Sequence, residues 1–63
     1  MNLVKLVDAY DTTRCVYVSP LEVKAVFVSR GHTVVLMTSG EKYVTDEPIE
    51  EVVENLDRAM LAD

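Results

Sequence analysis

Residues 23–45 read VKAVFVSRGHTVVLMTSGEKYVT, and this stretch decides the fold. Two glycine-containing breaks, Arg30-Gly31 and Ser39-Gly40, divide it into three apolar runs. Glycine supplies the positive φ that tight hairpin turns require. The stretch therefore predicts three antiparallel strands joined by two hairpins. The expected strands are residues 23–29, 32–38 and 41–45.

Two further strands are expected upstream, at residues 3–7 and 14–18, because both segments are rich in aliphatic and β-branched residues. A polar turn over residues 8–13 joins them, since short Asp and Thr side chains bond the local backbone. Pro20 ends the second of these strands because proline cannot donate to a strand ladder. A short bend at residues 21–22 then leads into the third strand.

The hydrophobic period changes after residue 45. Apolar residues now recur at spacings that place them on one face of a helix: Ile49, Val52, Val53, Leu56 and Met60. Pro48 suits the first turn, and Asp46 or Glu47 is expected to cap it. Glu54 and Arg58 have the i,i+4 spacing of an ion pair.

The order of elements predicts an α+β fold. We expect an antiparallel β-meander of four to five strands followed by one C-terminal α-helix that ends near Leu61. No linker, internal repeat or low-complexity tract interrupts the chain, so residues 1–63 are expected to form a single small domain.

Composition limits the classes of protein that fit. The chain has 63 residues, 49% of them apolar, with eleven acids against six bases and a net charge of -5. One cysteine excludes an internal disulfide framework and a cysteine-rich zinc site. No apolar run is long enough to span a bilayer, and the first residues do not resemble a signal peptide. These features predict a cytoplasmic protein without membrane insertion.

A chain of this length buries a small core, which rarely supplies more than about 3–5 kcal/mol. Disulfides and metals are not expected to reinforce it, which leaves self-association. The strand pattern agrees, because aliphatic residues point to both faces of the first, third and fourth strands while one helix covers one face. A strongly curled sheet that closes as a half-barrel is the alternative.

The uncovered sheet face is therefore the expected partner-binding surface. Either of two alternating sets of residues could form it, and the set that we favour includes Val26, Val28, Val35 and Met37. Phe27 and Tyr17 are the expected aromatic contributors. The acidic helix, with Glu50, Glu51 and Glu54, is the second expected partner-binding element.

No residue pattern points to catalysis, a cofactor or a metal. His32 is the sole histidine and no spacing assigns it a partner, so we expect a solvated turn residue. Cys15 is expected to be a half-buried small hydrophobe. The oxygen-rich segment at residues 8–12 lacks the glycine of a calcium loop and is expected to be a plain turn. We therefore predict a non-enzymatic protein.

Direct nucleic-acid binding is not favoured. The six basic residues are scattered among different predicted elements, and the net charge of -5 repels phosphate. The acids, in contrast, concentrate between residues 46 and 57, where they form a helix cap and a solvated helix face. That acidic surface would suit a basic protein partner.

Three motifs carry a resemblance to a known family: CVYV followed by SPLE at residues 15–22, HTVVLMTSGEKYVT at 32–45, and EPIEEVVENL at 47–56. With them the chain resembles the FlbD (swarming motility protein SwrD) family of small bacterial proteins, and similar short phage-encoded proteins. The resemblance implies a non-enzymatic accessory role in flagellar function or motility. Residues 6–13 and Ser39 depart from the family pattern.

Three functions remain open on the sequence. The leading one is a homo-oligomeric protein-interaction module that resembles flagellar accessory proteins. The alternative is an acidic regulator, encoded by a phage or mobile element, that binds and inhibits a host protein. The third is a small-ligand binder with a site between subunits, lined by Arg14, Arg30 or Tyr43.

Overall fold

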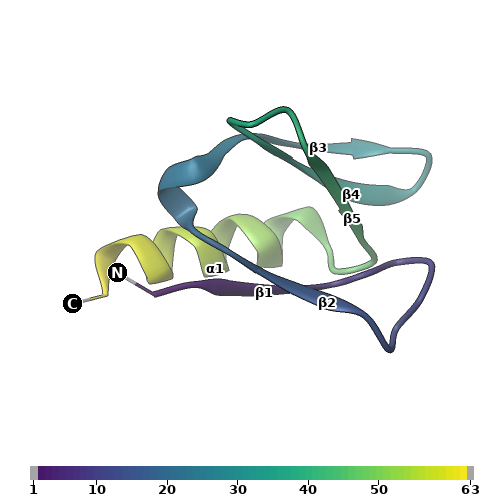
Figure 1. The fold of residues 1–63 in the computed structure, drawn as a ribbon, viewed down its shortest axis with the longest axis horizontal. Helices are drawn as coiled ribbons and strands as arrows, with labels where there is room; N and C mark the ends of the chain where they lie inside the picture. The colour runs from purple at the N-terminus through teal and green to yellow at the C-terminus, as the bar shows by residue number, and fades with distance from the viewer. Residues whose placement is uncertain (1, 63) are drawn as a thin grey trace.

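The structure is a computed structural model that describes residues 2–62. Five strands, one short 3-10 helix and one α-helix follow each other along the chain (Figure 1). In chain order they are β1 (Val4–Val7), β2 (Cys15–Val18), η1 (Pro20–Glu22), β3 (Val23–Ser29), β4 (His32–Met37), β5 (Lys42–Thr45) and α1 (Ile49–Leu61). The α+β prediction, antiparallel strands followed by one C-terminal helix, is confirmed.

The strands form two sheets instead of one. β1 and β2 make an antiparallel hairpin, and β3, β4 and β5 make a three-stranded antiparallel sheet in that order. The helix η1, which begins at Pro20, separates β2 from β3 and packs against α1. Because the chain changes direction over η1, β3 does not continue the ladder of β2. Figure 1 shows the hairpin and the sheet as separate layers.

A β-bulge interrupts β3 near its start. Val23 pairs with Met37 and Ala25 pairs with Leu36, so Lys24 is the extra residue between them. The bulge breaks the alternation of side chains along the strand. Val23 therefore packs against the core, and the register places Ala25 and Phe27 on the opposite face.

The turn between β3 and β4 is a two-residue hairpin. Ser29 pairs with His32, and the two residues between them both have positive φ, 53° at Arg30 and 79° at Gly31. Positive φ at both central positions is the pattern of a type I′ turn. Gly31 adopts this conformation without cost, whereas a side chain at Arg30 is strained by it.

We expect Arg30→Asn to raise the free energy of unfolding by about 1 kcal/mol, because asparagine tolerates the left-handed conformation that type I′ turns favour. Chemical denaturation followed by circular dichroism measures the change. Arg30→Ala is the matched control, since it removes the same guanidinium without that preference. An equal gain in both variants would mean that backbone conformation is not the cause.

The helix α1 begins after Pro48, which occupies the N-cap position and makes no side-chain capping bond. The prediction that Asp46 or Glu47 caps the helix is therefore wrong. Both side chains are engaged elsewhere: Asp46 contacts His32, and Glu47 accepts a 3.4 Å hydrogen bond from the Thr45 hydroxyl. No helix among residues 2–62 is long and apolar enough to cross a membrane.

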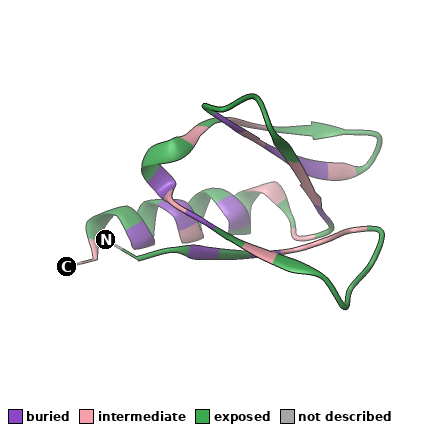
Figure 2. Ribbon diagram, in the orientation of Figure 1, coloured by how far each residue is buried: buried purple, intermediate pink, exposed green. Residues whose placement is uncertain are grey.

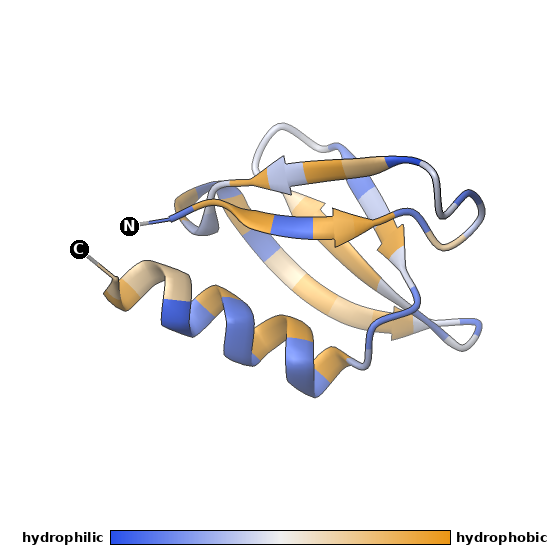
Figure 3. Ribbon diagram, turned by 90° about the horizontal axis from the view of Figure 1, so that it is seen from below, coloured by the Kyte–Doolittle hydropathy of each residue, from blue (hydrophilic) through white to orange (hydrophobic). Residues whose placement is uncertain are grey.

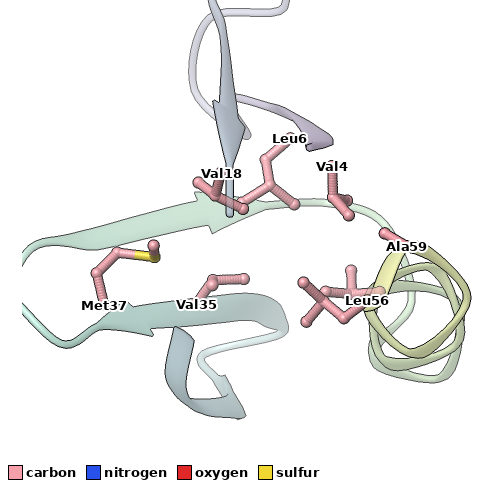
Figure 4. Packing of buried hydrophobic residues seen from close by; sticks show 8 residues of the cluster. Val4, Leu6, Val18, Val35, Met37, Leu56 and Ala59 are labelled. Atoms are coloured by element: carbon pink, nitrogen blue, oxygen red, sulfur yellow. The ribbon is translucent and has the colours of Figure 1, made fainter. Parts of the chain in front are cut away.

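The core lies where the hairpin, the sheet and the helix meet. Figure 4 shows side chains from all three converging, and Figure 2 shows buried residues on each of them. The core cluster consists of Val4, Leu6, Val18, Val35, Met37, Val52, Leu56 and Ala59. Three separate elements therefore enclose one small core, close to the half-barrel alternative considered from the sequence.

This arrangement corrects the predicted partner face. Val35 has no exposed surface and Met37 is also buried, because both point inward from β4. Val26 packs partly against the same core, and Val28 is 57% exposed. Most residues expected on an uncovered face therefore belong to the core. The other set of alternating residues, which includes Ala25 and Phe27, faces outward.

Candidate functional site

The outward side of the β3–β4–β5 sheet has an apolar centre. Cross-strand pairing aligns Phe27 with Val34 and Val44 in one row, and Ala25 with Leu36 in the next. These five residues, which we call the outer face, lie outside the core cluster. Phe27 is 38% exposed, whereas the central Val34 is shielded. An apolar row that faces away from the core is a candidate contact surface.

A cleft of about 210 Å³ opens beside the outer face. It lies between β5 and the β1–β2 hairpin, which a hydrogen bond from the Ala9 N–H to the Val44 carbonyl joins at 2.9 Å. Its apolar lining includes Leu6, Val16 and Val44. Its polar lining consists of Asp8, Tyr10, Arg14, Cys15, Lys42 and Tyr43. We call this site the cationic cleft.

Two cations line the cleft, the Arg14 guanidinium and the Lys42 ammonium. Among residues 2–62 the ion pairs are His32–Asp46 and Glu54–Arg58, so neither Arg14 nor Lys42 forms one. Partial desolvation and the neighbouring Glu41, which accepts a 3.2 Å hydrogen bond from the Tyr43 hydroxyl, raise the pKa of Tyr43. The phenol therefore stays neutral, and the charged side chains that line the cleft are the two cations and the Asp8 carboxylate.

The hairpin loop that forms one wall of the cleft is held by its own side chains. Asp8 accepts a 2.8 Å hydrogen bond from the Tyr10 N–H. Asp11 accepts two hydrogen bonds from Thr13, one from the hydroxyl at 2.6 Å and one from the N–H at 3.1 Å. The loop has the hydrogen bonding of the turn expected from the sequence.

The two hydrogen bonds from Thr13 lower the pKa of Asp11, and the charge of Arg14 adds a smaller effect. We expect Thr13→Val to raise this pKa toward its ordinary value, as measured by NMR titration of the carboxyl carbon. Since the folded-state pKa is depressed, the stability that ionised Asp11 contributes is present above the unfolded pKa and lost as pH falls. Thr12→Val is the matched control and should leave the titration unchanged.

His32 is not the free turn residue that the sequence suggested. Its Nδ1 lies 2.6 Å from Oδ1 of Asp46, and its ring meets that of Tyr10 edge-on at a centroid distance of 5.2 Å. The Asp46 carboxylate can accept a hydrogen bond from the Nδ1–H of His32, which fixes the orientation of the ring. These contacts hold the hairpin loop against β4 beside the outer face.

Sequence reasoning missed this pair, yet the second hairpin contained the signal. Thr33 pairs with Thr45 and Val34 pairs with Val44 across that hairpin. Extending the same register by one residue places His32 opposite Asp46.

Cys15 is a free cysteine and is exposed, which corrects the prediction of a half-buried hydrophobe. Val16 and Val18 point inward from β2, so the alternation of the strand turns Cys15 and Tyr17 outward. Tyr17 lies opposite Lys5 on the hairpin and does not join the outer face. Within residues 2–62 no three His, Cys, Asp or Glu side chains gather as a metal site would require.

The solvent side of α1 carries the predicted acidic surface. Hydrophilic and hydrophobic bands alternate along this helix (Figure 3). One shallow depression is lined by Ile49, Glu50, Val53, Glu54 and Asp57, and we call it the helix groove. Val53 is 42% exposed at its centre. Glu51 is exposed but lies outside the groove.

Comparison with known proteins identifies no relative: no family model, no curated protein and no solved structure matches this chain. The resemblance to the FlbD family therefore stays a prediction.

Proposed function

We propose that this chain is a non-enzymatic protein-interaction module that acts in the cytoplasm and associates with copies of itself through the outer face. The observation that carries the proposal is the orientation of the β3–β4–β5 sheet. The helix and the hairpin pack against its inner side, and the apolar residues of the outer face lie on its other side. The exposed free thiol of Cys15 fits a reducing compartment.

The energetics of a small domain support self-association. Burying a fully exposed large apolar side chain contributes about 1.5–3 kcal/mol, and Phe27, which is 38% exposed, would contribute a corresponding part of that. A core of this size rarely supplies more than about 3–5 kcal/mol. A contact that completes the burial of Phe27 and of the half-buried Leu36 and Val44 would therefore add to the stability of this small core.

Light scattering coupled to size-exclusion chromatography tests the proposal. We expect a mass above that of one chain for the wild type and the mass of one chain for Phe27→Asp, because association would bury the introduced charge. Leu61→Glu is the control, since Leu61 is exposed at the end of α1 and outside the outer face. A wild type that is monomeric throughout, or a Phe27→Asp variant that associates normally, would contradict the proposal.

A further inference from the structure

We propose that the occupant of the outer face and the cationic cleft is the acidic helix α1 of a second copy of this chain, seated head to tail by its helix groove. The inference rests on the proposed function and adds the identity of the second surface. It follows from three properties of the described residues: unpaired charges of opposite sign, matching apolar rows, and the placement of the two surfaces on the molecule.

The charges of the two surfaces are complementary, and within one chain Arg14 has only a small electrostatic effect on Asp11. The chain has six Lys and Arg residues, and two of them, Arg14 and Lys42, line the cationic cleft without an ion pair among residues 2–62. The helix groove presents Glu50 and Asp57, which also form no ion pair in that part of the chain. Glu54 is already paired with Arg58 at 2.6 Å. An acidic groove and a cationic cleft attract each other across an interface.

The apolar residues of the helix also match. Ile49, Val53 and Met60 are separated by four and seven residues, so they form one stripe along the helix. Val53 and Met60 are both exposed, next to the buried residues that hold α1 on its own core. An amphipathic helix that docks on an apolar surface uses anchors at this spacing. Phe27 and Leu36 on the outer face are suitable counterparts.

The two surfaces point away from each other within one chain. The inner side of the β3–β4–β5 sheet packs on the core, to which the helix contributes Val52, Leu56 and Ala59. The outer face and the helix groove therefore lie on opposite sides of the core. The helix groove of one chain therefore cannot bind the cationic cleft of the same chain. Because the contact joins two different surfaces, each pair of chains keeps one free cationic cleft and one free helix groove. Further copies can therefore add to form rings or open chains.

A mixing experiment with two variants tests this arrangement. Arg14→Glu/Lys42→Glu makes the cationic cleft acidic and keeps the native helix groove. Val53→Glu places a charge at the centre of the helix groove and keeps the native cleft. Sedimentation velocity should show higher assemblies for the wild type and at least about tenfold weaker association for each variant alone.

Mixing the two variants in equal amounts should produce a pair of two chains and nothing larger. The Arg14→Glu/Lys42→Glu variant (the cleft variant) has a native helix, which can bind the native cleft of the Val53→Glu variant (the helix variant). The reverse contact would bring the introduced glutamate of the helix variant against the acidic cleft, so like charges block it. Circular dichroism establishes that both variants are folded. Lys5→Glu and Leu61→Glu, which change exposed residues outside both surfaces, should associate like the wild type.

The outcomes separate this inference from the proposed function. A mixture that stays monomeric while Phe27→Asp still abolishes wild-type association would overturn the helix as occupant and leave the outer face as the interface. A cleft variant or helix variant that associates like the wild type would also overturn it. If Phe27→Asp itself has no effect on association, or the wild type is monomeric, both proposals fail.

Discussion

Val35→Asp is expected to abolish folding of the chain. Val35 has no exposed surface and lies at the centre of the core cluster on β4. A carboxylate there would be buried without a partner, at a cost of several kcal/mol, or would force its environment to open to water. Because a core of this size supplies about 3–5 kcal/mol, the unfolded state should dominate. Far-UV circular dichroism and the dispersion of the amide NMR spectrum measure this.

Phe27→Asp is the control for that variant, because Phe27 lies on the opposite side of the same sheet. It is 38% exposed and sits on the edge strand β3, so the new carboxylate reaches water. We expect it to stay folded with a modest loss of stability. A folded Val35→Asp together with an unfolded Phe27→Asp would show that the sheet packs on the core through the other face.

Leu6→Ala should lower the free energy of unfolding by about 2–5 kcal/mol, the range for truncation of a fully buried leucine. Leu6 is 2% exposed and brings the β1–β2 hairpin into the core. Without this side chain the hairpin loses a main attachment to the sheet and helix. Urea denaturation at constant temperature gives the change, and a large fraction of the variant should be unfolded before urea is added.

Leu3→Ala provides the matched comparison three residues earlier. Leu3 is 61% exposed, so the same truncation removes little buried surface, and we expect a change within about 0.5 kcal/mol. Equal losses in the two variants would indicate that β1 does not attach to the core through its inward side. A larger loss at Leu3 would reverse the assigned orientation of the strand.

The elements of the fold follow from local signals. The glycines at positions 31 and 40 adopt the positive φ that the hairpin prediction requires, and β3 spans the predicted residues 23–29. The 3.6-residue period after Pro48 predicts α1. Of the residues assigned to its apolar face, Val52 and Leu56 are buried, whereas Val53 and Met60 are exposed. The pairing of Glu54 with Arg58 at 2.6 Å confirms the expected i,i+4 contact. Each of these features depends on residues close together in the chain.

The choice of the buried sheet face was not readable from the sequence. β3 and β4 carry aliphatic residues on both sides, so alternation defines two faces without ranking them. The decision depends on where η1 redirects the chain and on the bulge at Lys24, which together bring the hairpin and the helix to the side of Val35. These are tertiary features that no local pattern contains.

The candidate site was predicted only in part. Arg14, Arg30 and Tyr43 were named as lining residues of a possible ligand site. Arg14 and Tyr43 line the cationic cleft, although within one chain instead of between two, whereas Arg30 lies in the β3–β4 turn outside it. Lys42 and Tyr10 were missed because the cleft forms where β5 meets the β1–β2 loop, a contact between residues about thirty positions apart. Of the predicted acidic residues, Glu50 and Glu54 share the helix groove.

The central claim is that copies of this chain meet through the outer face, and amide NMR spectra recorded over a dilution series test it most directly. We predict concentration-dependent shifts at the outer face, the cationic cleft and the helix groove, and constant shifts along β1 at Val4 and Lys5. Shifts at those strand positions alone, or no change at any amide on dilution, would contradict the account.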